Sequence, residues 1–318
     1  RLSLVGSEMC IRDSIKRHRY PHKFYYVSFD RPERSYRFNP LKVVRDRTEL
    51  IQLMEDVLLA LLPKKEQQNE WVAGGLGILR GVAFRFWDEF PEHCTLPHIL
   101  AFIMTASARQ LSLFLQQNLV SEMLAGAYLK AEGSEKTQAS YLSTLCNNLA
   151  TISQNEEIAY VLSGDDFDFN LIDPENPKLF AVSNNFSKNS VYAPVISMLM
   201  TISARQFSMQ NRVPFVYFLD EMTTVNIKNF ETLPSVLREY KAAFILLTQS
   251  GSKVENQYGR LDRSSVEANF GNQFFGRTKD VESLKYYPMI FGKEEKERRS
   301  RSTGKSGGST NRSVTVSS

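Results

Sequence analysis

Long apolar runs and cysteine are both scarce in this sequence of 318 residues. The best apolar window, Val57–Leu62, is about a third of the roughly 20 residues that a membrane-spanning helix needs, so no such helix is predicted within these residues. The three cysteines, Cys10, Cys94 and Cys146, lack metal-ligand spacing, which argues against a zinc site. Their odd number, without a secretory signal, favours a reducing compartment over a disulfide framework.

A strong charge of one sign is also missing from most of the chain. The formal net charge is +4, but positions 293–312 alone hold seven Lys and Arg against three Glu, so the other residues carry 32 basic and 32 acidic side chains. The basic excess is therefore a property of the C-terminal tail. The charge balance gives no evidence for a uniformly basic face that binds nucleic acid.

The phosphate-binding pattern GxxxxGK[ST] occurs nowhere in the sequence. The nearest match, at 304–306, has Arg299 where the first glycine should stand, and it lies in a Ser-, Gly- and Lys/Arg-rich tail with no predicted strand before it. The glycines at 74–77 resemble a phosphate loop only superficially, because no strand is predicted before them either. We therefore predict no phosphate loop within these residues.

The most informative stretch is Val213–Ser250, where two apolar runs flank a segment of helical character. The first run, Val213–Leu219, has the continuous pattern of a parallel strand buried on both faces, and it ends at Asp220 and Glu221. Ligands bind beyond the carboxyl ends of such strands. An Asp there can hold the Mg²⁺ shell, and a Glu can orient or deprotonate the attacking water. From these two residues alone, helix capping is an equally open interpretation.

Two further residues extend this hypothesis. Gln249 follows the second apolar run, Ala242–Leu247, 29 positions after Asp220, and an amide there can contact a γ-phosphate. Arg238 ends the predicted helix Phe230–Tyr240, where its guanidinium can reach the nucleotide of a neighbouring subunit as an arginine finger. Taken singly, Arg238 favours the alternative of a solvated cation at a helix C-terminus.

The run FLDEMTTVNIKNFETLPSVLREYKAAFILLTQSGSKVENQYG, followed by NFGNQFFGRTKD, resembles coupling proteins of the TraG/TraD class, hexameric ATPases of conjugation that are related to FtsK-like DNA pumps. The resemblance implies that Asp220 and Glu221 are the Walker B pair, with Asp220 holding Mg²⁺ through water. It makes Arg238 the finger and Gln249 the nucleotide sensor, and it makes Arg277 a second-rank interface or nucleotide-binding candidate. The implied cofactors are ATP and Mg²⁺.

The element pattern and the resemblance together predict an α/β fold: a RecA-like P-loop ATPase sheet, mostly parallel with helices on both faces, and an inserted all-α domain. Strands are expected at Phe24–Phe29 and Leu179–Val182, and helices at Thr48–Leu62 and Ala193–Gln210. The resemblance also implies that Gly276–Asp280, to which Glu267–Phe275 leads, continues the sheet towards the subunit interface. The expected units are 15–69 and 159–291 for the nucleotide-binding domain, 70–158 for the all-α domain, and 292–318 for a polar basic flexible tail.

The two ends of the sequence lead to further predictions, about a non-native leader and about segments of the native chain beyond these residues. Residues 1–14 contain SLVGSEMCIRD, which resembles translated sequencing-adaptor DNA, so we expect a non-native leader. We further expect the native chain to continue beyond both ends, with the Walker A loop and a membrane anchor upstream. Without that loop, these residues alone are expected to be inactive as an ATPase.

For the whole protein, the resemblance implies a homo-hexamer at the cytoplasmic face of the bacterial inner membrane. It would deliver a relaxase bound to single-stranded DNA to a type IV secretion channel, in contact with the inner-membrane components of that system. Two alternatives stay open. One is an FtsK/HerA-like DNA-pumping ATPase with another cargo, and the other is a non-catalytic receptor whose helical insert docks relaxosome proteins.

Overall fold

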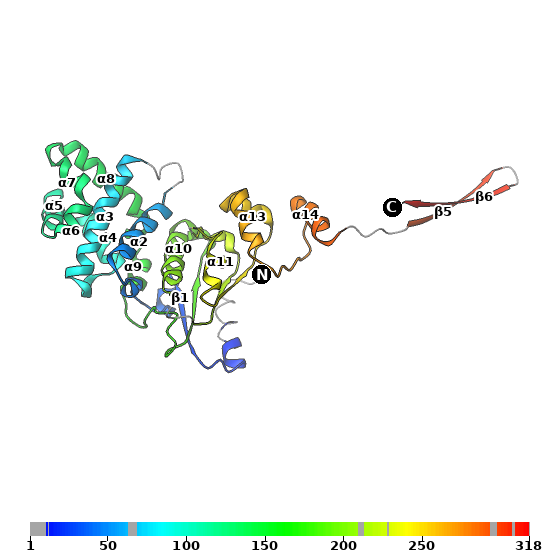
Figure 1. The fold of residues 1–318 in the computed structure, drawn as a ribbon, viewed down its shortest axis with the longest axis horizontal. Helices are drawn as coiled ribbons and strands as arrows, with labels where there is room; N and C mark the ends of the chain where they lie inside the picture. The colour runs from blue at the N-terminus through cyan, green and yellow to red at the C-terminus, as the bar shows by residue number, and fades with distance from the viewer. Residues whose placement is uncertain are drawn as a thin grey trace.

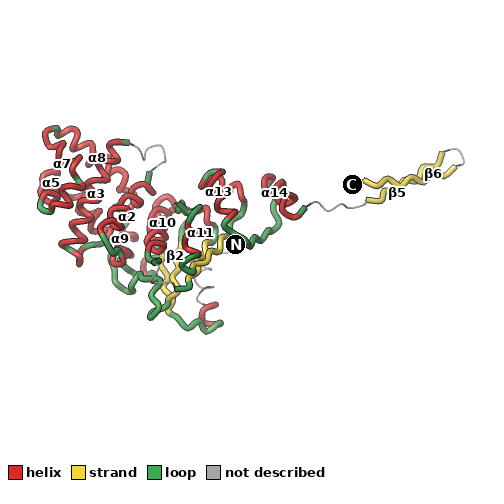
Figure 2. The backbone as a smooth tube through the Cα atoms, viewed as in Figure 1, coloured by secondary structure: helices red, strands yellow, loops and turns green. Residues whose placement is uncertain are grey.

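The computed structural model describes Ile11 and residues 13–62, 69–208, 213–227, 229–292, 298–306 and 309–317. The leader predicted at 1–14 lies almost wholly outside these ranges. A block of helices forms one end of the elongated molecule, and a two-stranded ribbon forms the other (Figure 1). Helices predominate, with short paired strands between the two ends (Figure 2). No helix among the described residues is long and apolar enough to cross a membrane.

The helical block follows the predicted periodicity. Its first helix begins earlier than the predicted Thr48, because the carboxylate of Asp46 accepts a hydrogen bond from the amide of Glu49 and caps the first turn. Between Asn69 and Ser163 the described residues contain helices and no strand. The helices are α2 (Arg47–Ala60), α3 (Glu70–Glu89), α4 (Leu96–Thr105), α5 (Ala108–Gln116), α6 (Leu119–Leu124), α7 (Gly126–Lys130), α8 (Glu135–Ser153) and α9 (Glu156–Leu162).

Helix α3 is the central element of this block, because it packs against α2, α6 and α8. Its glycines explain how the neighbours come so close. A β-carbon on Gly74 would overlap the ring of Tyr141, and one on Gly77 would lie 2.7 Å from the carbonyl oxygen of Leu124. The glycine-rich stretch at 74–77 therefore serves close helix packing, in agreement with our rejection of it as a phosphate loop.

Four strands form two parallel pairs, each within two residues of its predicted position. Strand β1 (Lys23–Ser28) pairs with β2 (Lys178–Ser183), and β3 (Phe215–Leu219) pairs with β4 (Ala242–Leu246). Helix α10 (Asn189–Arg205) connects the two pairs, and α11 (Leu233–Arg238) lies between β3 and β4 in the chain. The described residues thus show the predicted mix of helices and parallel strands, but as two separate pairs rather than one sheet.

The prediction that β3 is buried on both faces is wrong for this chain. Tyr217 is 5% exposed and packs with Phe207 and Leu237, whereas Val216 and Phe218 on the opposite face are 57% and 61% exposed. Ile245 of β4 is also exposed. Among the described residues, helices therefore cover only one face of the β3–β4 pair. A continuous run of apolar residues looks the same in the sequence whether one face or both faces of the strand are covered by this chain. The sequence pattern could therefore not distinguish the two cases.

The C-terminal part differs from expectation in two places. Helices α12 (Gly251–Tyr258) and α13 (Arg260–Ala268) cover a small core around Phe230, but the segment 269–280 forms no strand, so the expected continuation of the sheet is wrong. It leads into α14 (Val281–Phe291). Strands β5 (Arg298–Ser306) and β6 (Ser309–Ser317) then form an antiparallel ribbon where the sequence analysis placed a flexible tail. A composition rich in charged residues, Ser and Gly does not by itself predict such a ribbon.

The two described cysteines should differ in reactivity. Burial raises the pKa of the Cys94 thiol to about 12 and raises the pKa of the half-buried Cys146 thiol as well. A raised pKa leaves less thiolate at pH 8 than a free cysteine has. Because the thiolate is the reactive form, both thiols should react more slowly than a free cysteine. In a Cys10→Ser background, we expect a disulfide reagent to modify Cys146 slowly and Cys94 only after unfolding, as read by peptide mapping. Equal labelling rates at the two sites would contradict this packing.

Candidate functional site

The carboxyl ends of β3 and β4 lie side by side. Leu219 pairs with Leu246 in the parallel register. Beyond the ladder, the amide of Leu247 donates to the carbonyl of Leu219 over 3.0 Å, and the amide of Met222 donates to the carbonyl of Leu247 over 3.1 Å. The polar residues that follow the two strands therefore occupy one edge of the sheet. This is the edge at which α/β proteins bind ligands.

Glu221 has an unusual backbone conformation at this edge. Its φ of 53° and ψ of 64° lie in the left-handed region, which costs a residue with a β-carbon on the order of 1 kcal/mol. Local hydrogen bonds hold the turn, since the carbonyl of Glu221 accepts from the amide and the hydroxyl of Thr224, each over 3.0 Å. The hydroxyl of Thr223 donates to the Glu221 carboxylate over 2.7 Å. Within its own turn, the side chain of Glu221 is thus held at one carboxylate oxygen by Thr223.

Lys253 brings Glu221 and Gln249 together, and the sequence analysis missed it. Its Nζ donates to Gln249 Oε1 over 2.7 Å and lies 4.0 Å from Glu221 Oε2. It occupies the first turn of α12, whose cap Ser250 accepts from the Lys253 amide. The available signal was its spacing of four residues from Gln249, at the start of a helix.

Asp220 and Arg238 lie at opposite ends of the β3–β4 pair. Asp220 is exposed at the shared edge, directly before Glu221. Arg238 is exposed in the last turn of α11, and its carbonyl accepts from the amide of Lys241, which precedes β4. Arg238 is therefore at the amino end of β4, and Gln249 is beyond its carboxyl end. The strand between them has five residues and is about 16 Å long. Arg238 does not reach the edge of its own chain that carries Asp220.

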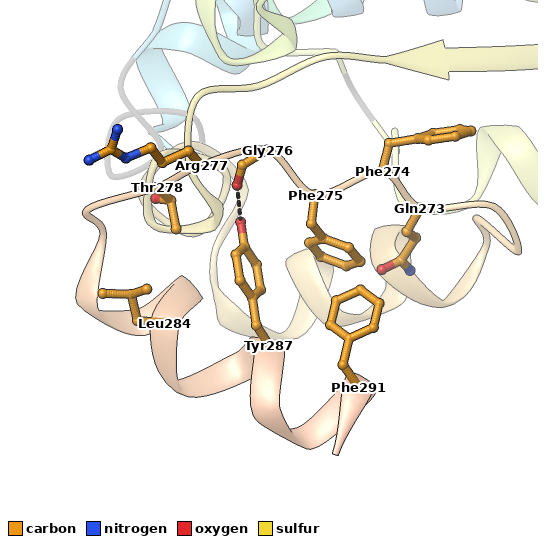
Figure 3. A pocket seen from close by; sticks show the side chains of 9 residues that line it. All are labelled: Gln273, Phe274, Phe275, Gly276, Arg277, Thr278, Leu284, Tyr287 and Phe291. Carbon is orange, nitrogen blue, oxygen red and sulfur yellow. Dashed lines mark hydrogen bonds between the residues drawn. The ribbon is translucent and has the colours of Figure 1, made fainter. Parts of the chain in front are cut away.

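Arg277 lies in the extended segment before α14, beside a pocket of about 540 Å³. Phe275, Tyr287 and Phe291 line this pocket, and the Arg277 side chain points away from the aromatic rings (Figure 3). A hydrogen bond of 3.0 Å from the Ser252 hydroxyl to Asp280 ties the segment to α12. The described contacts do not bring Arg277 to Glu221 or Gln249, and most of the pocket's lining is aromatic or aliphatic.

The donor set fits only part of a magnesium–nucleotide site. Mg²⁺ is commonly held by one or two carboxylates together with water and phosphate oxygens, and Asp220 supplies an exposed carboxylate of that kind. Within the described ranges, no three His, Cys, Asp or Glu side chains are grouped to hold a metal without such help. The residues present therefore fit the metal and water side of the site but not the cradle for the phosphates.

Parallel strands connected by helices place the chain among α/β proteins, and the adjacent acids and the amide at one carboxyl edge make that edge the candidate site. Residues 214–318, a third of the chain, match the family model described as the TraM recognition site of TraD and TraG. No curated protein matches the chain.

Solved structures of a conjugative coupling protein share the fold. TrwBdeltaN70 in its trigonal form with sulphate is 16% identical with a TM-score of 0.60, over 80% of this chain and 63% of that one. TrwB with ADP and Mg²⁺ is 15% identical with a TM-score of 0.59, over 81% of this chain and 64% of that one. The chain thus spans slightly less than two thirds of their length. The resemblance to TraG/TraD-type coupling proteins is confirmed.

Proposed function

We propose that this chain carries the downstream half of the ATP-hydrolysing site of a conjugative coupling protein. The observation that carries the proposal is the joint placement of Glu221 and Gln249 by Lys253 at one carboxyl edge. A carboxylate for water and an amide for the terminal phosphate are the groups that phosphoryl transfer to water needs on that side. The solved TrwB complexes with ADP and Mg²⁺ and with an ATP analogue support ATP and Mg²⁺ as the cofactors.

The phosphate cradle is proposed to come from a strand–helix unit outside these residues. Parallel sheets are normally covered on both faces, yet Val216, Phe218 and Ile245 leave one face of the β3–β4 pair exposed. A unit that bears the phosphate loop would bury this face and place its backbone amides beside Asp220. The same unit would supply the phosphate loop, whose GxxxxGK[ST] pattern does not occur in this sequence.

The roles proposed for the individual residues follow from where they lie. Asp220 would hold Mg²⁺ through water, and the bound ion would neutralise charge on the phosphate oxygens. Glu221 would orient and deprotonate the attacking water, and Gln249 would contact the γ-phosphate. Arg238, at the opposite edge of the sheet, would act on the nucleotide of a neighbouring subunit. Arg277 stays a second-rank candidate for an interface or nucleotide contact.

For the whole protein, we propose a homo-hexamer that delivers a relaxase with single-stranded DNA to a type IV secretion channel. It would work at the cytoplasmic face of the inner membrane, held by an upstream anchor and in contact with the secretion system's inner-membrane components. An FtsK/HerA-like pump with another cargo is the alternative within the same mechanism. The family description of residues 214–318 as a recognition site favours a second candidate, a receptor for relaxosome proteins.

The test compares ATP hydrolysis by this chain with hydrolysis by the protein extended upstream through a phosphate loop. We expect no turnover from the chain alone, and turnover stimulated by single-stranded DNA from the extended protein. Hydrolysis by the chain alone that persists after Glu221→Gln would overturn the proposal. Capture of relaxosome proteins by the extended protein, without any ATP turnover, would favour the receptor.

A further inference from the structure

We infer that Lys253 is a positioning residue of this site, which fixes the orientation of the Gln249 amide and holds the Glu221 carboxylate beside it. The catalytic part of the inference rests on the proposed function, but the geometric part does not. Lys253 Nζ lies 2.7 Å from Gln249 Oε1, the distance of a charge-assisted hydrogen bond. The same nitrogen lies 4.0 Å from Glu221 Oε2.

The contact decides which end of the amide faces a ligand. A glutamine amide has an accepting oxygen and a donating NH₂ group of similar shape, and only its partners fix the orientation. Because the ammonium of Lys253 can only donate, it holds Oε1 and leaves the NH₂ group of Gln249 for another partner. That group can donate to an anionic phosphoryl oxygen. The opposite orientation would aim an oxygen at the phosphate and repel it.

Lys253 can do this because packing fixes its helix to the turn that carries Glu221. Next to it, Val254 is 5% exposed and packs in one core with Met222. One turn further on, the hydroxyl of Tyr258 donates to the carbonyl of Val225 over 2.9 Å. Helix α12 is therefore anchored to the segment after β3. The Lys253 side chain is 46% exposed, so its ammonium lies at the surface of this edge.

The neighbouring cation is already engaged elsewhere. Arg263 donates to Glu255 over 3.0 Å and to Glu267 over 2.8 Å. A β-carbon on Gly251 would lie 2.5 Å from an Arg263 nitrogen, so the guanidinium packs closely on the first residue of α12. Arg263 thus stabilises the helix pair, and Lys253 is the cation directed at Gln249 and Glu221.

The first experiment tests the geometry in this chain and needs no activity. The side-chain amide of Gln249, assigned in an ¹⁵N NMR spectrum with the help of Gln249→Asn, should show ¹H and ¹⁵N chemical shifts displaced from those of a free glutamine amide, because Lys253 donates to its oxygen. Lys253→Met should bring it to the values of a free amide, and Lys253→Arg should largely preserve it. Lys130→Met, at an exposed position of α7, is the matched control. A Gln249 signal that Lys253→Met leaves unchanged would overturn the inference.

The second experiment measures ATP hydrolysis in the protein extended through its phosphate loop. Lys253→Met should lower kcat about tenfold with little change in KM, because it acts on the orientation of Gln249 rather than on nucleotide capture. Lys253→Arg should restore most of the rate. Unchanged kcat in Lys253→Met, while Glu221→Gln is inactive, would overturn the inference and leave the proposed function standing. Full activity of Glu221→Gln would instead overturn the proposed function.

Discussion

Glu221→Gln is expected to abolish ATP hydrolysis in the protein extended through its phosphate loop, with a fall in kcat of at least about 10². A glutamine keeps the shape of Glu221 and can still accept from the Thr223 hydroxyl, which lies 2.7 Å from the carboxylate. It cannot take a proton from water. Nucleotide affinity should change little, because the contacts proposed to hold the nucleotide are made by other groups. Steady-state turnover and equilibrium nucleotide binding, measured on the same preparation, check the two halves of this prediction.

The control for this result is Glu122→Gln, at an exposed position of α6 far along the chain from the site. It removes the same charge and should leave kcat unchanged. A second comparison is Asp220→Asn, which should weaken binding of the magnesium–nucleotide complex rather than spare it. If Glu221→Gln and Asp220→Asn both reduce affinity without changing kcat, the division of labour between the two carboxylates is wrong.

The strands and the polar ends of the site could be predicted because they follow from strictly local patterns. Apolar runs with polar residues after them located β3 and β4, and a shared parallel edge then placed Glu221 near Gln249. The left-handed backbone of Glu221 could not be predicted, since it depends on the hydrogen bonds of the turn. The contact of Lys253 with Gln249 is local, but its approach to Glu221 depends on how α12 packs against the turn after β3, which no local pattern predicts.

The exposed face of the β3–β4 pair could not be predicted for a different reason. The hydrophobicity of a side chain indicates that it is stable when buried, and Val216 and Phe218 are both strongly apolar. Hydrophobicity does not indicate which helix or strand covers the side chain, or whether that element belongs to these residues. The ribbon β5–β6 illustrates the opposite case, in which backbone pairing forms in a segment whose composition favours no regular structure.

The proposed boundary between residues 69 and 70 raises a separate question about how the chain unfolds. Helix α2 precedes this boundary and packs directly against α3, which follows it, and it also packs against α10. Arg205 of α10 and Asp56 of α2 form an ion pair of 2.7 Å. One continuous core includes residues from β1, the helical block and α10. This packing couples residues 70–158 to α2, α10 and the β1–β2 pair, although the expected domain boundary separates them.

Ile78→Ala is therefore expected to destabilise more than the helical block. Ile78 of α3 is 0% exposed, and truncating such a side chain costs about 2–5 kcal/mol of the free energy of unfolding. Leu113→Ala is the control, because that side chain is 51% exposed and its removal should change stability by less than about 0.5 kcal/mol. Urea unfolding followed by circular dichroism measures both values.

Hydrogen exchange in the same Ile78→Ala variant then separates the two descriptions of the chain. A continuous core requires the amides of β1, β2 and α10 to lose protection together with those of α3 and α8, since opening α3 removes apolar partners from all of them. The β3–β4 pair, whose buried residues belong to smaller clusters, should change less. Loss of protection confined to residues 70–158 would instead mean that the helical block unfolds alone, as an inserted domain would.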